Sequence, residues 1–251
     1  MTCEVSVVIP VFNESANIER LVTSLNDYFS GQTFTAEVLF VDDGSSDDSR
    51  DRLAGQRPAA YAAKIIALEK NFGSHAALRA GIRHAEGERV TCLAADLQDP
   101  PALVGRLREK CLEGFRVAFA SRNSSRGPSL DRFFSKVYAQ MVRWFLFPFF
   151  PENGFDVVMF DRAVKDRLDA DMRKNGSLFL EILSFKMPTG VITYDKDDRK
   201  AGQSKWTLSK KIKLFLGSFF SRGKWVPEKD VFVIRDIISL KASEKKEPYV
   251  A

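Results

Sequence analysis

The 251-residue sequence predicts an α/β fold with a mostly parallel sheet flanked by helices. Short runs rich in β-branched residues recur about every 30 residues in the first half of the chain, and segments with helical periodicity separate them. This alternation is typical of βαβ units, in which crossover helices join parallel strands. The runs are apolar on both faces, as expected for strands that helices cover on each side.

Five strands and the helices between them follow one another in the first half. The strands are expected at residues 5–11, 37–41, 64–68, 89–93 and 117–120. Apolar helical faces are formed by Ile18, Leu21, Val22 and Leu25 after the first strand, and by Leu103, Leu107 and Cys111 after the fourth. Each helix therefore has one side suited to packing against the sheet.

The regular alternation ends after residue 120. The elements expected beyond it are, in order, a polar loop (121–131), an aromatic helix (133–145), strands at 157–160 and 191–194 with helices near 162–169 and 178–185, a polar loop (195–207) and a basic amphipathic helix (208–219). We divide the chain into a domain over residues 1–205, the amphipathic helix at 206–221 and a charged tail over 222–251. The tail has a strand-like run at 231–234 and no membrane span.

The net charge of +5 is unevenly distributed. Residues 1–160 carry 18 Lys and Arg against 20 Asp and Glu, a net charge of −2, whereas residues 161–251 carry 20 against 13, a net charge of +7. Such a basic segment suits an anionic surface or ligand, or forms an ordinary solvated face. Nucleic-acid binding is not expected, because the basic stretch lacks regularly spaced aromatic residues for base stacking.

Cysteine usage and the apolar runs indicate a cytoplasmic location. The three cysteines are widely spaced and form no CxxC motif, which fits a reducing compartment. The apolar run at 5–11 is too short and too β-branched for a signal peptide. The longest uncharged aromatic run, at 144–151, is far shorter than the roughly 20 residues that span a bilayer.

A carboxylate and an amide follow the strand expected at 89–93. Asp96 and Gln98 are two residues apart, so in an extended chain their side chains point the same way and can share one hard divalent cation. Acidic strand ends would repel a diphosphate unless a cation lay between them. The sequence therefore predicts that a metal ion accompanies a nucleotide diphosphate at this strand end.

Other strand ends supply side chains to the same edge of the sheet, where open α/β sheets bind ligands. Phe12 and Glu14 follow the strand that contains Pro10, one suited to stacking on a base and the other to accepting a hydrogen bond from ribose or base. Asp42 ends the second strand and can accept a base N–H, and Asn71 follows the third. The chain has no GxGxxG after the first strand and no GxxxxGK[ST], which argues against dinucleotide oxidoreductases and P-loop ATPases.

Six motifs, in order from about residue 4 to about residue 220, resemble the family-two inverting glycosyltransferases. They are Val-Ile-Pro-Val-Phe-Asn-Glu (8–14), Val-Asp-Asp-Gly-Ser (41–45), Asn-Phe-Gly (71–73), Ala-Asp-Leu-Gln-Asp-Pro-Pro (95–101), Phe-Asp-Val-Val-Met-Phe-Asp-Arg (155–162) and Arg-Lys-Ala-Gly-Gln-Ser-Lys-Trp-Thr (199–207). The most similar branch contains enzymes like dolichol-phosphate-mannose synthase and bactoprenyl-phosphate glucosyltransferase.

The resemblance implies a GT-A (Rossmann-like) catalytic domain at 1–205, a nucleotide-diphosphate sugar donor and Mg²⁺ or Mn²⁺. It implies that Asp96 and Gln98 hold the metal, that Asp96 and Asp156 are catalytic, and that Asp156 faces the anomeric carbon of the sugar. The residues placed around the nucleotide sugar are Pro10, Phe12, Glu14, Asp42, Asn71 and Asp96. Those placed at the acceptor phosphate are Arg199, Lys205 and Arg122.

Two departures from the family pattern bear on these expectations. Ala94 stands where the family often has a further Asp, so the metal loses one potential ligand. Residues 222–251 are charged, where members that act on lipid phosphates usually continue into membrane-spanning helices. The second departure affects membrane anchoring more than catalysis.

The expected function is metal-dependent, inverting transfer of a hexose from a nucleotide-diphosphate sugar to a polyprenyl phosphate. The expected partners are the donor, the lipid phosphate and an anionic membrane surface, which places the protein peripherally on the inner face of the cell membrane. A homo-oligomer stays open. Two alternatives also stay open: a transferase that extends a surface glycan at a sugar hydroxyl, and a catalytically silent protein that binds sugar nucleotides.

Overall fold

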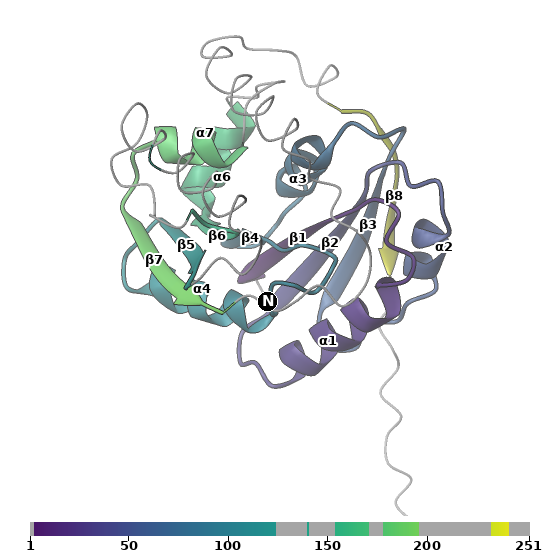
Figure 1. Ribbon diagram of the computed structural model, residues 1–251, viewed down its shortest axis with the longest axis horizontal. Helices are drawn as coiled ribbons and strands as arrows, with labels where there is room; N and C mark the ends of the chain where they lie inside the picture. The colour runs from purple at the N-terminus through teal and green to yellow at the C-terminus, as the bar shows by residue number, and fades with distance from the viewer. Residues whose placement is uncertain (1–2, 124–139, 141–153, 171–177, 196–231, 241–251) are drawn as a thin grey trace, which may run out of the picture.

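The computed structural model describes residues 3–123, 140, 154–170, 178–195 and 232–240, which form a helix-flanked sheet (Figure 1). Eight strands form the sheet in the order β7-β5-β6-β4-β1-β2-β3-β8. Their bounds are β1 Val5–Val11, β2 Ala36–Asp42, β3 Ala62–Leu68, β4 Arg89–Cys92, β5 Val117–Arg122, β6 Val157–Asp161, β7 Thr189–Tyr194 and β8 Ile234–Leu240. The mostly parallel α/β sheet predicted from the sequence is confirmed.

Strand direction determines which residues reach the site. Strands β4, β1, β2 and β3 are mutually parallel, and β5 is parallel to β7. Strand β6 is antiparallel to both β4 and β5. The start of β6 therefore lies at the edge where the neighbouring strands end, and Asp156, which directly precedes β6, joins their carboxyl-terminal residues.

Helices cover both faces of the sheet, as the apolar strands require. Their bounds are α1 Ile18–Ser30, α2 Ser49–Ala54, α3 Ser74–Arg83, α4 Ala102–Leu112, α6 Arg162–Ala170 and α7 Leu178–Ser184. Apolar residues of α1, α2 and α4 pack in one core with Val7 and Ile9 of β1. Residues of α3, α6 and α7 pack in a second core with Val8. Successive residues of β1 thus point to opposite cores.

Strand β8 lies within the segment 222–251 that the sequence suggests is a charged tail. It pairs antiparallel with β3 at the edge of the sheet, so this part of the segment belongs to the fold. The predicted position of this strand, residues 231–234, is wrong, because β8 begins at Ile234 and continues to Leu240. Polar residues within β8 made the strand hard to predict from the sequence. One of them, Asp236, pairs with Arg50 of α2 at 2.7 Å, a contact that is possible because β8 is a half-buried edge strand.

Several expected elements lie outside the described residues. They are the aromatic helix at 133–145 apart from residue 140, the loop from 196 to 207 and the basic helix at 208–219. In the described part of the chain, no helix combines the length and apolar character needed to cross a bilayer.

Candidate functional site

Residues from seven neighbouring strands gather at one edge of the sheet. The loop after β1 crosses to the loop after β2, where Asn13 accepts a hydrogen bond from the Ser46 amide at 2.8 Å and donates its own amide to the Ser45 hydroxyl at 3.0 Å. Asn13 has a φ of 53°, a left-handed conformation that asparagine tolerates better than most residues. These bonds fix the backbone on either side of the expected nucleoside residues.

Three of the expected nucleoside residues lie along β1 and the loop that follows it. Pro10 lies within the strand, opposite Val41, and the strand continues past it by one residue. Phe12 is partly exposed directly after the strand. Glu14 Oε2 accepts a hydrogen bond from Asn17 Nδ2 at 2.7 Å, which holds its carboxylate at the start of α1.

The two carboxylates at the end of β2 have different partners. Asp42 Oδ1 accepts the Ser45 amide at 3.2 Å. Asp43 accepts the amides of Phe72 and Gly73 at 2.7 and 2.9 Å, which ties the loop containing Asn71 to β2. Burial raises the pKa of the Asp43 carboxyl to about 6, against the opposing effect of these two amides.

Close backbone packing explains why glycine follows this carboxylate pair. Gly44 has a φ of 65°, and a Cβ there would lie 2.5 Å from the carbonyl carbon of Lys70. The loops after β2 and β3 can approach this closely only with glycine. Asp43 is not among the expected site residues, although two adjacent carboxylates followed by a glycine are a signal of a tightly held loop.

The expected metal ligands lie in a turn. Strand β4 ends at Cys92, one residue before the expected end, and Leu97 has a φ of 59°. The assumption that Asp96 and Gln98 continue an extended strand is therefore wrong. Instead, the Gln98 amide donates to Asp96 Oδ1 at 3.2 Å, which closes the turn around the buried carboxylate.

The residues of this turn fit a hard divalent cation. A carboxylate and an amide oxygen are ligands that Mg²⁺ and Mn²⁺ accept, and such cations commonly take their other ligands from phosphates and water. The described residues contain no group of three or more His, Cys, Asp or Glu side chains that could hold a metal by themselves. A cation at Asp96 and Gln98 would therefore need ligands from the bound nucleotide.

Asp156 is held by two side chains from adjacent strands. Arg122 Nη2 donates to Asp156 Oδ1 at 3.0 Å. The Tyr194 hydroxyl lies 3.1 Å from Asp156 Oδ2 and donates to Asp99 Oδ1 at 2.6 Å. Burial and the two carboxylates raise the pKa of this hydroxyl above its ordinary value, so Tyr194 keeps its proton.

The chain of Arg122, Asp156, Tyr194 and Asp99 links β5, β6, β7 and the turn after β4. Arg122 and Asp156 were expected at the site from the sequence, whereas Tyr194 and Asp99 were not expected as their partners. Asp99 is buried and hydrogen-bonded to Tyr194. Arg199 and Lys205, expected at the acceptor phosphate, lie outside the described residues.

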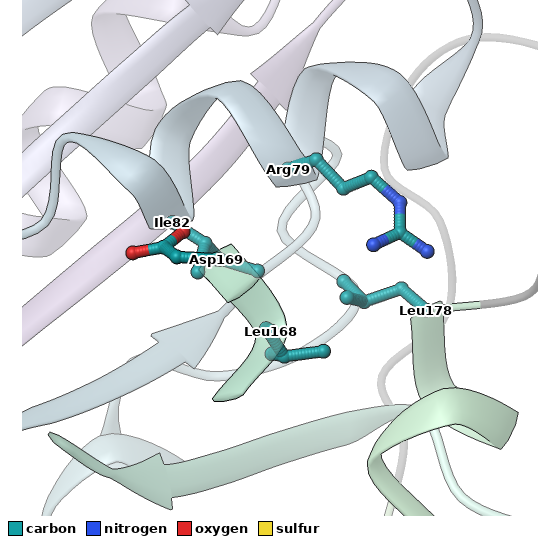
Figure 2. A pocket seen from close by; sticks show the side chains of 5 residues that line it. All are labelled: Arg79, Ile82, Leu168, Asp169 and Leu178. Carbon is teal, nitrogen blue, oxygen red and sulfur yellow. The ribbon is translucent and has the colours of Figure 1, made fainter. Parts of the chain in front are cut away.

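A second polar cluster lies between α3, α6 and α7, away from this edge (Figure 2). Its cavity is lined by Arg79, Ile82, Leu168, Asp169 and Leu178 and holds about 10 Å³, room for about one water molecule. The buried guanidinium of Arg79 pairs with Glu181 of α7. The cluster is thus a helix-packing contact without space for a substrate.

Comparison with known proteins gives consistent matches over most of the chain. The family profile described as Glycosyl transferase family 2 matches residues 6–166. An uncharacterized glycosyltransferase of Synechocystis is 32% identical over 225 residues, covering 88% of this chain and 70% of that protein. An undecaprenyl-phosphate 4-deoxy-4-formamido-L-arabinose transferase of Yersinia enterocolitica is 31% identical over 217 residues, covering 84% of this chain and 65% of the relative.

A solved structure shows the same fold. Glucosyl-3-phosphoglycerate synthase from Mycobacterium tuberculosis, in complex with Mn²⁺, UDP-glucose and phosphoglyceric acid, superposes with a TM-score of 0.60 at 16% identity. The match covers 86% of this chain and 77% of the synthase. The sheet and its flanking helices therefore have the same fold as this synthase.

Proposed function

Because the chain belongs to glycosyltransferase family 2, we propose that it transfers a hexose from a nucleotide-diphosphate sugar to a polyprenyl phosphate, with inversion at the anomeric carbon. The observation that carries this proposal is the ion pair of Arg122 and Asp156, which Tyr194 links to Asp99 in the turn after β4. The name of the Yersinia relative, an undecaprenyl-phosphate sugar transferase, supports the acceptor class.

The nucleoside would bind between the ends of β1, β2 and β3. Phe12 would stack on the base, Asp42 would accept a base N–H, and Glu14 would accept from the ribose or base. Pro10 and Asn71 would complete the walls of this pocket. The bonds from Asp43 to the Phe72 and Gly73 amides support this assignment, because they hold the Asn71 loop against β2.

Asp96 and Gln98 would hold Mg²⁺ or Mn²⁺ together with the donor diphosphate. When bound, the cation offsets the negative charge that develops on the leaving diphosphate. The solved synthase with Mn²⁺ and UDP-glucose supports a divalent cation in this fold. Asp96 is buried and braced by the Gln98 amide, so its carboxylate is already oriented before the donor arrives.

The reaction would be a single in-line displacement. An oxygen of the acceptor phosphate attacks the anomeric carbon, the bond from that carbon to the diphosphate oxygen breaks, and the nucleoside diphosphate leaves with the electron pair. A phosphate monoester has a second pKa near 6 and is mostly ionised at neutral pH, so this acceptor needs no strong base. Asp156 would then orient the acceptor and stabilise positive charge on the sugar.

Three basic side chains would receive the acceptor phosphate. Arg122 already lies beside Asp156, and a guanidinium can donate two parallel hydrogen bonds to a phosphate. Arg199 and Lys205 would grip the same phosphate from the loop that follows β7. A hydroxyl acceptor has no negative charge for such a group to bind, so the cation at Arg122 favours a phosphate over a glycan hydroxyl.

The basic part of the chain would bring the protein to its lipid acceptor. Residues 161–251 carry a net charge of +7, and each basic residue near an anionic surface contributes about 1 kcal/mol to binding. Peripheral attachment to the inner membrane face would place the site beside the polyprenyl phosphate.

A donor screen tests the proposal. The full chain is incubated with a mixture of nucleotide sugars, a short polyprenyl phosphate and Mn²⁺, and the products are identified by mass spectrometry. We expect one glycosylated polyprenyl phosphate, whose formation EDTA abolishes. Transfer only to a sugar hydroxyl would establish the surface-glycan alternative, and absence of both transfer and donor hydrolysis would establish a silent binding protein.

A further inference from the structure

We infer that the Tyr194 hydroxyl is a positioning group for sugar transfer, because it connects the Asp156 carboxylate to Asp99 on the turn that carries the expected metal ligands. The inference rests on the proposed function, which places Asp156 beside the anomeric carbon. Tyr194 itself would touch neither substrate nor metal. Its contribution would be to hold two groups on opposite sides of the reaction at a fixed separation.

The backbones around Asp156 are already fixed by the sheet. The Asp156 amide donates to the carbonyl of Ala120 at 3.0 Å, which anchors the start of β6 to β5. Tyr194 is the last residue of β7 and lies opposite Arg122 in the register of β5 and β7. The remaining freedom of Asp156 is therefore rotation of its side chain.

Arg122 and Tyr194 restrict this rotation from two sides. Arg122 contacts Oδ1 at 3.0 Å and Tyr194 contacts Oδ2 at 3.1 Å, so each carboxylate oxygen has its own partner. Without the phenol oxygen, Asp156 would keep its ion pair at Oδ1 and lose the contact that Tyr194 makes with Oδ2. The guanidinium thus holds Oδ1, and the hydroxyl holds Oδ2 and so sets the orientation of the carboxylate plane.

Asp99 connects the same hydroxyl to the metal turn. The Tyr194 hydroxyl donates to Asp99 Oδ1 at 2.6 Å, the shorter of its two contacts, and both side chains are buried. Asp99 directly follows Gln98 in the chain. A shift of the turn is therefore transmitted through one hydrogen-bonded oxygen to the carboxylate that faces the acceptor.

In-line displacement is sensitive to such shifts. The acceptor oxygen, the anomeric carbon and the leaving oxygen must be aligned, and a displacement of about 1 Å can cost on the order of 10²-fold in rate. Donor binding at the nucleoside end depends on residues after β1, β2 and β3, which the Tyr194 hydroxyl does not contact. Loss of the hydroxyl should therefore lower kcat and leave donor affinity unchanged.

Tyr194→Phe removes the hydroxyl and keeps the buried ring. Two matched variants remove a tyrosine hydroxyl elsewhere: Tyr28→Phe, whose oxygen accepts the Gly105 amide at 2.9 Å, and Tyr61→Phe, whose buried oxygen has no hydrogen-bond partner among the described residues. Neither hydroxyl contacts a residue of the site. These variants measure what losing a structural or unpaired hydroxyl does to stability and rate.

The test compares steady-state kinetics of the full-length variants, with donor and polyprenyl phosphate varied separately and donor Kd measured by calorimetry. We expect Tyr194→Phe to lower kcat 10- to 100-fold with donor KM and Kd within twofold of wild type, while Tyr28→Phe and Tyr61→Phe keep wild-type kcat. A kcat within twofold of wild type, or a loss of donor affinity parallel to the loss of kcat, would overturn the inference.

Asp99→Ala keeps the inference testable if Tyr194→Phe fails to fold. We expect a loss of kcat alone in this variant and, where Tyr194→Phe folds, no additional loss when the two substitutions are combined, because both break one connection. Additive losses would show independent roles and overturn the inference.

If wild type glycosylates only a hydroxyl acceptor, the proposed function fails, and the same ratio of variant to wild-type kcat on that acceptor still decides the role of Tyr194.

Discussion

Arg122 and Asp156 form an ion pair, with 3.0 Å between Nη2 and Oδ1, where β5 ends and β6 begins. Because β6 runs against its neighbours, this pair lies at the same edge as the acidic ends of β2 and the turn after β4. One cation therefore lies next to the carboxylate that the proposed reaction places at the sugar. The Arg122 guanidinium can bind the negative charge of a phosphate acceptor, whereas a neutral hydroxyl acceptor offers it no charge to bind.

Substituting Arg122 should weaken the acceptor side of the reaction. We expect Arg122→Ala to raise the KM for polyprenyl phosphate at least 10-fold and to leave donor Kd within about twofold, because the lost guanidinium is the group proposed to bind phosphate. Arg122→Lys should recover only part of this loss, since an ammonium cannot donate in parallel from a planar fork. Separate titrations of donor and acceptor measure both effects.

Arg116, which directly precedes β5, supplies a control. It pairs with Asp161 at 3.3 Å at the opposite edge of the sheet. Arg116→Ala should leave both KM values unchanged. Equal effects of the two substitutions would assign Arg122 a purely structural role.

Asp96→Ala should abolish turnover and metal-dependent nucleotide binding while the fold survives. The reason is that Asp96 and Gln98 are the only protein ligands proposed for the cation, so removing the carboxylate removes the charged one. Calorimetric titration of the nucleotide with and without Mn²⁺ checks the binding part. Retention of more than about a tenth of wild-type activity, less than about 1.4 kcal/mol of lost transition-state stabilisation, would contradict the metal site.

The control for Asp96 is an exposed carboxylate. Asp51 lies on α2 and is exposed, so Asp51→Ala should leave nucleotide binding unchanged. Asp99, only three residues from Asp96 in the sequence, is unsuitable as a control. It is buried and hydrogen-bonded to Tyr194.

Asp43→Ala should lower donor affinity about 10-fold or more. The substitution leaves the Phe72 and Gly73 amides without their acceptor, at a cost of about 1–3 kcal/mol for each donor that stays buried, and so frees the loop that holds Asn71. Donor Kd from calorimetry measures the effect. Asp161→Ala is the matched variant, because Asp161 also accepts a backbone amide, that of Val164, but at the far edge. Equal donor Kd values for the two variants would contradict the role given to Asp43.

His75 should make the fold sensitive to mild acid. Burial and the nearby Arg79 lower the pKa of its imidazole from 6.5 to about 4. Between these two pH values the unfolded chain therefore binds a proton at His75 and the folded chain does not. Stability is therefore lost as pH falls from 6.5 toward 4, by about 2 kcal/mol at pH 5 from this group. Urea unfolding at pH 7.5 and pH 5 should show this loss in wild type and a smaller one in His75→Phe.

His84 is the only other histidine and is partly exposed. His84→Gln should keep the acid sensitivity of wild type. If His75→Phe loses as much stability as wild type between pH 7.5 and pH 5, another group is responsible for the acid sensitivity.

The sequence predicted the strands of the parallel sheet well because each contains a short, mostly apolar run that is buried between helices. Strand β8 was misplaced because Arg235 and Asp236 interrupt such a run, and only pairing with β3 makes them part of a strand. The turn at Asp96 was read as extended because nothing in the local sequence marks Leu97 for a left-handed conformation.

The partners of Asp156 could not be predicted from the motifs. Tyr194 and Asp99 are 95 positions apart in the chain and meet because the end of β7 and the turn after β4 lie at the same edge of the sheet. No spacing rule encodes such a contact, since it depends on the order of the strands. Arg122 and Asp156 were placed by resemblance, and that resemblance said nothing of the hydrogen bonds between them.

The most direct test of the central claim is to follow the phosphorus of the acceptor. In ³¹P NMR of a reaction with the full chain, the donor found by the screen, Mn²⁺ and a short polyprenyl phosphate, we predict that the monoester resonance disappears as a phosphodiester resonance and the nucleoside diphosphate appear in equal amounts. Release of nucleoside diphosphate with the monoester resonance unchanged, and the sugar recovered on a hydroxyl acceptor, would contradict the account.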